Sequence, residues 1–213
     1  AVYAAADRLS CYNCRFTGWQ DTIFNGDPMT CNMKKLMLPD FFQASEVPIV
    51  HKFYRNYFKD CYVCGDVDYI FGPNTAFFDH CEIHSIARVS EGKAYITAAS
   101  TPAGQEFGLV FSHCRITGEE PDSVYLGRPW RDCAKTAFIC CELGDHICPE
   151  GWQNWGKVRA EVLSDYIEYG NFGPGADCSG RSPLSRCLVN PEVETYFSKE
   201  NVLVGEDGWI PAE

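Results

Sequence analysis

Five short segments of this chain repeat one pattern, and this repeat limits the possible folds more than any other feature. Each segment has an aromatic residue or Cys, two further residues, a Cys, one residue, and then Phe or an aliphatic residue. The segments are CYNCRF at 11–16, FKDCYV at 58–63, FDHCEI at 78–83, FSHCRI at 111–116 and FICCEL at 138–143. In an extended chain the Cys and the apolar residue two places on share one face, and the polar residue before the Cys in four of the segments suits a bend. Each unit therefore predicts a strand, a bend and a second strand.

The spacing of these units predicts a solenoid. Successive repeat cysteines lie 47, 20, 33 and 27 residues apart, and stacked coils tolerate such irregular spacing when insertions leave one face as loops. One coil plus a loop insertion at 27–50, where the strand pattern is broken, explains the longest interval. We therefore predict an all-β chain folded as a right-handed parallel β-helix.

Composition is consistent with a single β-helix domain over residues 1–213. The chain is 46% hydrophobic, which is enough for one long core, and it has no run of about 18 apolar residues that would indicate a membrane span. The polar, Gly-rich and acidic sequence at 150–213 predicts loops or short helices packed on the coils. Because strand-like sequence follows Ala1 at once, we expect N-terminal coils of a longer domain to be missing.

Thirteen cysteines allow a zinc site, disulfides or a buried ladder of thiols. The pairs Cys11/Cys14 and Cys61/Cys64 have the spacing of zinc ligands, but residues three apart on a strand point to opposite faces. Five cysteines share one phase of the repeat, which favours thiols stacked inward from coil to coil. These five are Cys14, Cys61, Cys81, Cys114 and Cys141. The odd total leaves at least one thiol unpaired in a monomer, so oxidising and reducing compartments both remain open.

The formal net charge of −11 argues against a nucleic-acid partner, because nucleic-acid recognition requires a basic surface. A solvated acidic surface is the simplest explanation of this charge. The charge would also repel a polyanionic substrate, whereas a neutral ester of the same polymer would not be repelled.

A second internal similarity places two carboxylates at one phase. The segment GWQDTIFNG at 18–26 aligns without a gap with GDVDYIFGP at 65–73, which brings Asp21 onto Asp68. In a stacked fold these aspartates would lie on neighbouring strands about 4.8 Å apart. Close carboxylates share protons unequally, which suits acid, base and nucleophilic chemistry. The alternative is that both aspartates only close turns.

Three other side chains could complete such a site. Gln20 offers an amide donor to a developing oxyanion, and Arg128 in YLGRPWR at 125–131 could hold a carboxylate by two parallel bonds. Trp130 provides a flat face that can stack on a sugar ring. Arg128 and Trp130 could equally form a structural salt bridge and a packed aromatic. The chain has no G-x-S-x-G elbow and no H-E-x-x-H pattern, and the histidines at the repeat bends are interpreted as structural.

Three motifs resemble signatures of the pectin methylesterases, the carbohydrate esterases that demethylate homogalacturonan. They are GWQDTIF, GDVDYIFG and YLGRPW, in the family's order, and the similarity extends to DRLSCYNCRFTG before the first motif and to YITAAS at 95–100. The family fold is a right-handed parallel β-helix, in agreement with the repeat. The resemblance implies hydrolysis of pectin methyl esters to pectate and methanol, with no metal and no organic cofactor.

Carried over residue by residue, the resemblance implies a catalytic role for four candidates. Asp68 would be the nucleophile that attacks the ester carbonyl, and Asp21 would be the general acid and then the general base. Gln20 would stabilise the oxyanion. Arg128 would orient Asp68 and keep it ionised.

The resemblance also implies substrate contacts, a binding partner and a cellular location. Trp130 would line the sugar cleft, and Tyr69 and Phe71 would flank the nucleophile as further substrate-binding residues, although one of two adjacent strand residues should point inward. The partner would be methylesterified homogalacturonan bound by a monomer, outside the cell. A cytoplasmic location stays open because so many cysteines fall at a buried repeat position.

Part of the family domain is expected to be absent. Family members carry another glutamine just ahead of the segment that matches 1–7, and several further coils upstream. Without them the first coil would expose a strand edge and one oxyanion donor would be missing, which can lower the rate about a hundredfold. We therefore expect an esterase site with reduced activity.

Two other functions stay open. A β-helix polygalacturonate glycosidase or lyase also uses clustered acids, and carboxylates about 5 Å apart suit a retaining glycosidase. A non-catalytic pectin-binding solenoid is the second alternative. The products separate these possibilities, since they would be methanol, new reducing ends, an unsaturated sugar, or none.

Overall fold

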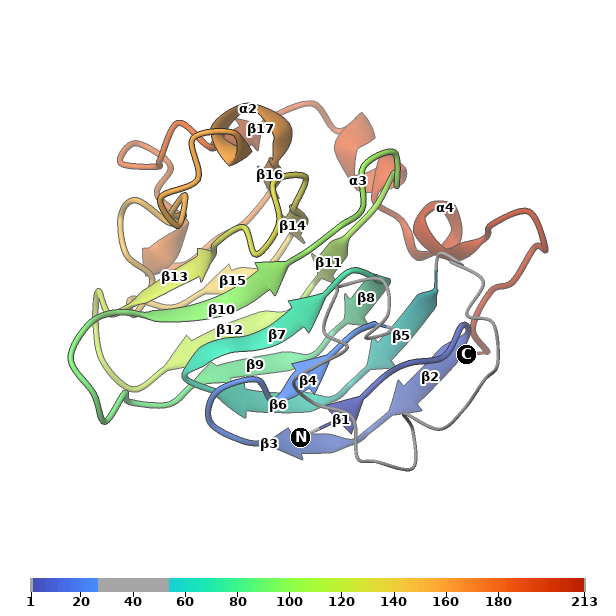
Figure 1. Cartoon of the computed structure of the whole chain (residues 1–213), viewed down its shortest axis with the longest axis horizontal. Coiled ribbons are helices and arrows are strands. Elements are labelled where there is room, and N and C mark those ends of the chain that lie inside the picture. Colours follow the sequence, from blue (N-terminus) through green and yellow to red (C-terminus); the bar gives the residue numbers. More distant parts are fainter. Residues whose placement is uncertain (1, 27–53, 213) are drawn as a thin grey trace.

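The computed structural model describes residues 2–26 and 54–212, whose strands form three parallel sheets wound into one β-helix (Figure 1). Neighbouring strands within each sheet run parallel, because each belongs to a successive coil. The predicted fold class, an all-β right-handed parallel β-helix, is confirmed. The insertion expected at 27–50 lies outside the described residues.

The central coils each pass through a strand of sheet B, a strand of sheet C and a strand of sheet A before the next coil begins. Sheet A contains β1 (Val2–Tyr3), β4 (Ile23–Phe24), β7 (Val67–Gly72), β10 (Ala94–Ala99) and β13 (Val124–Gly127). Sheet B contains β2 (Leu9–Tyr12), β5 (Arg55–Lys59), β8 (Thr75–Asp79), β11 (Leu109–Ser112), β14 (Lys135–Ile139), β16 (Asp165–Tyr169) and β17 (Ser185–Leu188). Sheet C contains β3 (Arg15–Thr17), β6 (Tyr62–Gly65), β9 (Glu82–Ser85), β12 (Arg115–Gly118) and β15 (Glu142–Leu143).

One residue with left-handed backbone dihedrals follows each of six successive sheet B strands and turns the chain toward sheet C. The bend residues are Asn13, Asp60, His80, His113, Cys140 and Gly170. Their φ values lie between 51° and 64°, a conformation that Asn, Asp and Gly tolerate best. The bend predicted from the repeat is confirmed. The sequence pattern does not reveal the sixth unit, because Asn171 replaces the Cys there and accepts a hydrogen bond from the Cys141 N–H at 2.9 Å.

A column of stacked phenylalanines fills the centre of the coils. Phe58, Phe78, Phe111 and Phe138 stand on four successive sheet B strands, and their ring centroids are 4.7, 4.7 and 4.5 Å apart. The planes of adjacent rings differ by 10° or less. All four are fully buried, so the aromatic position of the repeat supplies much of the apolar surface that the coils remove from water.

The repeat cysteines form a second column beside these rings. The column contains Cys14, Cys61, Cys81, Cys114 and Cys141. All but Cys14 are fully buried, which confirms the predicted thiol ladder. The four buried thiols reach the preceding coil: for example, Cys81 Sγ donates to the Phe58 carbonyl and Cys114 Sγ to the Phe78 carbonyl, both at 3.3 Å. Among the described residues, neither Cys-x-x-Cys pair belongs to a group of side chains that could hold a metal ion.

The C-terminal part extends the coil stack. In addition to the loops and short helices expected there, it contains two further strands of sheet B: β16 pairs with β14, and β17 pairs with β16. The helices are α2 (Ala160–Leu163), the 3-10 helix η1 (Pro174–Ala176), α3 (Glu192–Tyr196) and α4 (Lys199–Leu203). None of the helices in the described part of the chain is long and apolar enough to cross a membrane.

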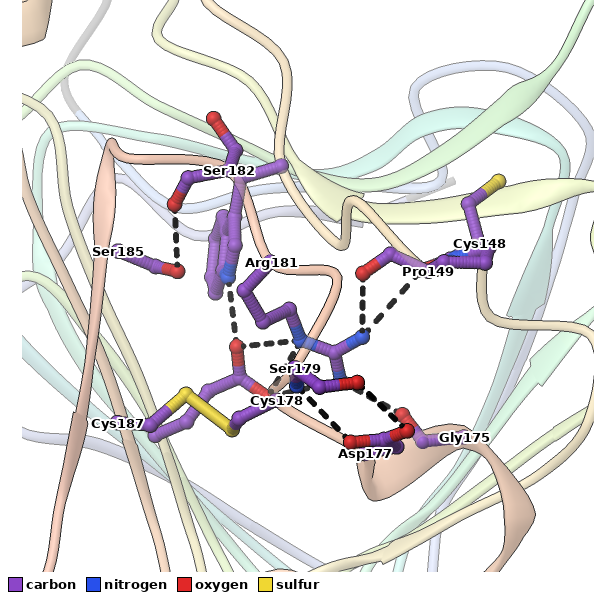
Figure 2. Close-up of a disulfide and its surroundings, with 12 residues drawn as sticks. Cys148, Pro149, Gly175, Asp177, Cys178, Ser179, Arg181, Ser182, Ser185 and Cys187 are labelled. Atoms are coloured by element: carbon purple, nitrogen blue, oxygen red, sulfur yellow. Dashed lines mark hydrogen bonds and ion pairs between the residues drawn. A yellow bond between two sulfur atoms is a disulfide. The ribbon is translucent and has the colours of Figure 1, made fainter.

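A disulfide and a buried ion pair lie together near the last strand of sheet B. Cys178 and Cys187 form the disulfide (Figure 2). Close by, Arg181 Nε lies 2.9 Å from a Glu168 carboxylate oxygen, and the two side chains are only 4% and 2% exposed. Arg181 also donates to the Gly175 carbonyl at 2.6 Å. These hydrogen bonds compensate for removing both charges from water, so the segment is fixed to the end of the β-helix.

The helices α3 and α4 cover part of the outer face of sheet B (Figure 1). Val193 of α3 and Phe197 just after it pack against Ile139. Leu203 of α4 packs in a neighbouring cluster with Tyr57. An outward-facing apolar row of sheet B is thereby removed from water, and the helices are held in fixed positions over the sheet.

Replacing Phe111 by Ala tests the central stack. The ring lies between Phe78 and Phe138 and is fully buried, so we expect the free energy of unfolding to fall by about 3–5 kcal/mol. Urea denaturation followed by circular dichroism would measure this loss. Phe172→Ala is the control, because that side chain is 57% exposed and its loss should cost about 0.5 kcal/mol or less. Equal losses in both variants would contradict the stack as a main source of stability.

Candidate active site

The two aspartates occupy equivalent positions on adjacent coils. β4 pairs with β7 so that Ile23 lies opposite Ile70 and Phe24 opposite Phe71. This register is the gapless alignment predicted from the sequence, and it is confirmed. The Asp21 N–H donates to the carbonyl of Val67, the residue before Asp68, at 3.1 Å. This hydrogen bond holds Asp21 beside β7, the strand that carries Asp68.

Both aspartates have an unusual backbone conformation. φ is 59° at Asp21 and 50° at Asp68, in the left-handed region that Asp enters more easily than bulkier residues. At Asp68 the strand also carries one extra residue. Tyr95 of β10 pairs with Val67 but Thr97 pairs with Ile70, so β7 bulges between these contacts. A bulge redirects side chains locally, which places Asp68 outside the regular alternation of the strand.

Glycine is required just before this strand because the coils approach closely there. A Cβ on Gly65 would collide with the Trp19 carbonyl of the preceding coil and with the Tyr69 side chain. Gly18, the equivalent residue of the first copy, has a similar restriction, since its Cβ would lie 2.6 Å from Thr22 Oγ1. The recurrent glycine of the two motifs therefore permits the two aspartate-bearing segments to stack.

Arg128 binds Asp68 through two parallel hydrogen bonds. Arg128 Nε donates to Asp68 Oδ1 at 2.9 Å and an Nη donates to Oδ2 at 2.8 Å. The side chains are 16% and 8% exposed, so the pair is largely removed from water. The guanidinium carbon lies 3.8 Å from the ring centroid of Tyr95 and 3.8 Å from that of Trp155. Arg128 is thus held between two aromatic faces while it fixes the carboxylate.

The surroundings raise the pKa of both carboxyl groups, but the causes that raise and lower the pKa differ between Asp21 and Asp68. Burial, followed by the neighbouring charge of Asp68, raises the pKa of Asp21 to about 6, and Arg128 only partly opposes this. Burial also raises the pKa of Asp68, but the hydrogen bonds and charge of Arg128 pull it down. The pair therefore favours an ionised Asp68 beside an Asp21 that takes up a proton near pH 6.

Aromatic side chains gather on the outer side of sheet A beside the aspartates. The Phe71 ring centroid lies 4.9 Å from that of Phe24 and 5.7 Å from that of Trp130. Trp155 joins this cluster at its partly exposed edge. Lys157 Nζ lies 4.0 Å from the Trp155 ring centroid, and its charge also acts on Asp68. The result is an apolar wall with cationic groups beside it, in a protein whose net charge is negative.

The structure brings together most of the residues selected from the sequence. Asp68 and Arg128 are hydrogen-bonded, the charges of both act on Asp21, and Trp130 and Phe71 belong to the adjacent aromatic cluster. These contacts place the residues but leave their catalytic roles as predictions. The exposed Gln20 immediately precedes Asp21.

The structure corrects the expected position of Tyr69. It is fully buried in the core of the coils, and its hydroxyl lies 3.0 Å from Ser85 Oγ. A substrate on the outer face of sheet A cannot contact it, so the expectation that Tyr69 binds substrate is wrong. The bulge explains the position, because it lets Tyr69 and Ile70 both face the core although they are consecutive.

Sequence reasoning missed Tyr95 and Trp155, the residues that enclose Arg128. Tyr95 begins the YITAAS segment, and Trp155 belongs to EGWQNWG at 150–156. The second tryptophan of that segment was the signal that sequence reasoning could have used. In the structure Trp152 is buried, whereas Trp155 is partly exposed. Within residues 2–26 and 54–212, no group of metal-ligating atoms converges at this site.

Comparisons with known proteins agree with this geometry. The family model described as Pectinesterase matches residues 43–206. The chain belongs to the pectinesterase family. Pectinesterase 31 of Arabidopsis thaliana is 37% identical to it over 194 residues, which make up 90% of this chain and 51% of that protein. The chain thus spans about half the length of this relative.

Solved pectin methylesterases share the fold of this pectinesterase chain. The enzyme from carrot matches with a TM-score of 0.74 at 26% identity, covering 94% of this chain and 58% of that one. A pectin methylesterase in complex with a hexasaccharide matches with a TM-score of 0.69 at 24% identity, covering 99% of this chain and 60% of that one. At that identity the second match supports the fold alone.

Replacing Asp21 by Asn should make the protein more stable at neutral pH but not in acid. Because the pKa of Asp21 is raised to about 6 in the folded state, the folded chain binds this proton more tightly than the unfolded chain. The wild-type free energy of unfolding should therefore fall as pH rises from about 4 through 6. Asn suits the left-handed φ and carries no charge, so the variant avoids this fall.

Urea unfolding of both proteins at about pH 3.5 and pH 7.5 would measure the difference. We expect little gain from Asp21→Asn at the lower pH and a clear gain at the higher one. Asp60→Asn is the matched control, because Asp60 is exposed and has a φ of 53°. A gain for Asp21→Asn that is the same at both pH values, or that Asp60→Asn reproduces, would contradict the proposed electrostatics.

Proposed function

We propose that this chain hydrolyses the methyl esters of homogalacturonan, releasing methanol and leaving pectate. The observation that carries the proposal is the pairing of Arg128 with Asp68 by two hydrogen bonds of 2.9 and 2.8 Å, directly beside Asp21 with its raised pKa of about 6. Membership of the pectinesterase family supports the same reaction. The solved complex of a pectin methylesterase with a hexasaccharide indicates that an oligosaccharide can bind to a protein of this fold.

In the first step, the ionised carboxylate of Asp68 attacks the carbonyl carbon of a methylated galacturonate. Arg128 aligns the carboxylate and favours its charged form, while burial keeps it poorly hydrated and reactive. Negative charge then develops on the former carbonyl oxygen. The exposed amide of Gln20, the residue just before Asp21, would stabilise this oxyanion.

In the second step, protonated Asp21 gives its proton to the methoxy oxygen, and methanol leaves an acyl group on Asp68. The Asp21 carboxylate then accepts a proton from water, which attacks the acyl carbon and releases the product acid and free Asp68. One water is consumed and one methanol is formed for each ester. A pKa of about 6 suits this double role, because Asp21 can both give and take a proton near that pH.

The outer face of sheet A would bind the polymer. Trp130, which is partly exposed, presents the aromatic surface on which sugar rings can stack, and the buried ring of Phe71 supports it from behind. Trp155, between Arg128 and Lys157, extends this surface. The carboxylate product lies beside Asp68 and Asp21 and is repelled by them, whereas the neutral ester is not. This difference favours release of the product.

We infer that the protein acts as a secreted monomer on cell-wall pectin. The Cys178–Cys187 disulfide supports an oxidising location. The ladder of buried thiols is compatible with it, because thiols enclosed in a packed core are protected from oxidants.

Methanol release from highly methylated pectin tests the proposal. We expect the parent chain to release methanol, and Asp68→Asn to reduce the rate by a factor of about 10³ or more because the nucleophile is lost. Asp60→Asn, at an exposed bend with a similar φ, should retain the parent rate. Polymer length and absorbance of unsaturated sugars are followed in the same sample. Chain shortening or unsaturated products would support the glycosidase or lyase alternative, and pectin binding without turnover would support a binding solenoid.

Replacing Arg128 by Lys tests the role of the two parallel hydrogen bonds. Lysine keeps one positive charge but cannot form the bidentate pair. We expect kcat/KM to fall about 100-fold or more, and the acid limb of its pH profile to move to higher pH, because the pKa of Asp68 rises when the hydrogen bonds from Arg128 no longer lower it. Unchanged activity with an unchanged pH profile would contradict the proposed role of Arg128.

A further inference from the structure

A second group of reactive side chains lies far from the aspartates in the fold, at the bend between sheets B and C. His113 and Cys140 are the bend residues of two adjacent coils, with φ values of 54° and 53°. The His113 N–H donates to the Ile139 carbonyl at 3.0 Å, which fixes the two bends at the spacing of neighbouring strands, about 4.8 Å. Because both backbones have the same conformation, the two side chains leave the coil in similar directions.

The third member of the group comes from α3. Val193 packs on the outer face of sheet B in a cluster that includes Ile139 and Cys140, and this contact positions the next residue, Glu194. Glu194 Oε1 lies 3.8 Å from His113 Nε2. The ligand atoms of His113, Cys140 and Glu194 all lie within 4.8 Å of one another. Three donors from three separate segments thus converge on one point.

The surroundings of His113 suit a metal ligand. Its Nδ1 lies 2.9 Å from Ser112 Oγ, and its ring is stacked on that of His80 with a centroid separation of 5.2 Å and an angle of 7°. When Nδ1 carries the proton and donates it to Ser112, the lone pair of Nε2 is free to bind a cation. A hydrogen bond to the other ring nitrogen and a restrained ring are the usual supports of a metal-bound histidine.

We propose that His113 Nε2, Cys140 Sγ and the Glu194 carboxylate bind one divalent transition-metal ion of the Zn²⁺ class, with water in the remaining position. A nitrogen, a sulfur and an oxygen donor suit Zn²⁺ and Co²⁺, whereas Mg²⁺ and Ca²⁺ prefer oxygen ligands alone. The ligand atoms need to close by only about 1 Å to reach tetrahedral Zn²⁺ distances. His113 and Glu194 are 43% and 52% exposed, so the ion can enter from solvent.

Such a site would be structural and independent of the esterase reaction. It would join the two adjacent bends to α3 and so fix the C-terminal helices on the outer face of sheet B. The other convergent group of the described residues, Glu168 with Cys178 and Cys187, does not offer the same chemistry. Its two sulfurs form a disulfide and its carboxylate is paired with Arg181.

Titration with Zn²⁺ and with Co²⁺, in a buffer that keeps the Cys140 thiol reduced, tests the proposal. We expect the parent chain to bind one Zn²⁺ at this site, and Co²⁺ to give the near-ultraviolet charge-transfer absorption that a thiolate ligand produces. Cys140→Ser should abolish that absorption. His113→Asn and Glu194→Gln should each weaken Zn²⁺ binding about 100-fold, since losing a supporting partner alone typically costs about 10–100-fold.

These variants should keep the fold. Asn13 occupies the same bend of the first coil with a φ of 52°, so asparagine suits the position of His113, and the Glu194 side chain is half exposed. His84 and Glu119 supply the matched control, because their side chains lie 3.7 Å apart and they belong to no convergent group within the described residues. His84→Asn and Glu119→Gln should change Zn²⁺ affinity less than about threefold.

Binding of Zn²⁺ should also change the thermal stability of the protein. Zn²⁺ should raise the Tm of the parent and of the two control variants, and this rise should disappear in Glu194→Gln, whose fold is not at risk. Absence of Zn²⁺ binding to the parent, cobalt absorption that survives Cys140→Ser, or equal losses of affinity in the control variants would each overturn the proposal.

Discussion

The ion pair between Asp68 and Arg128 depends on the stacking of three successive coils. The two residues lie on β7 and just after β13, with β10 between them, so the arginine must reach across an intervening strand. It does so over the ring of Tyr95, which belongs to that strand. A pair this buried is favourable only when its geometry is fixed and its remaining hydrogen bonds are satisfied. The parallel register of sheet A provides the first condition, and the two parallel hydrogen bonds provide the second.

The same stacking makes the two aspartates unequal. Both stand at the same phase of adjacent coils with left-handed φ values, yet only Asp68 is paired with Arg128. Asp21 is partly buried and also experiences the charge of Asp68, so its pKa rises to about 6. A repeat thus supplies two carboxylates from one structural position, and a single arginine distinguishes them. The proposed nucleophile and the proposed general acid require this difference between the two carboxyl groups.

The sequence was sufficient to predict the features that recur along the chain. The phase of Asp21 and Asp68, the buried column from Cys61 to Cys141 and the bends all follow from short-range periodicity, and the structure agrees with them. Periodicity fails where the chain departs from regular alternation. The bulge at Asp68 lets the consecutive residues Tyr69 and Ile70 both face the core, which regular alternation does not predict.

Contacts between distant segments were also beyond sequence reasoning. Trp155 reaches Arg128 from a loop after the last strand of sheet A, and Glu194 reaches His113 from a helix that packs back on sheet B. Neither pairing has a fixed spacing along the chain. The interpretation of the bend histidines as structural rests on their position in the repeat, whereas the Glu194 side chain beside His113 becomes visible only in the folded molecule.

The most direct test of the account is a carbon-13 NMR titration of the two carboxyl groups, with resonances assigned by Asp21→Asn and Asp68→Asn. The account predicts that Asp68 loses its proton first as pH rises, and that the Asp21 resonance titrates with a pKa of about 6. In Asp68→Asn the Asp21 midpoint should move to lower pH, because the neighbouring charge is gone. If Asp21 ionised before Asp68, or if its midpoint were unchanged in Asp68→Asn, the proposed division between nucleophile and acid would be contradicted.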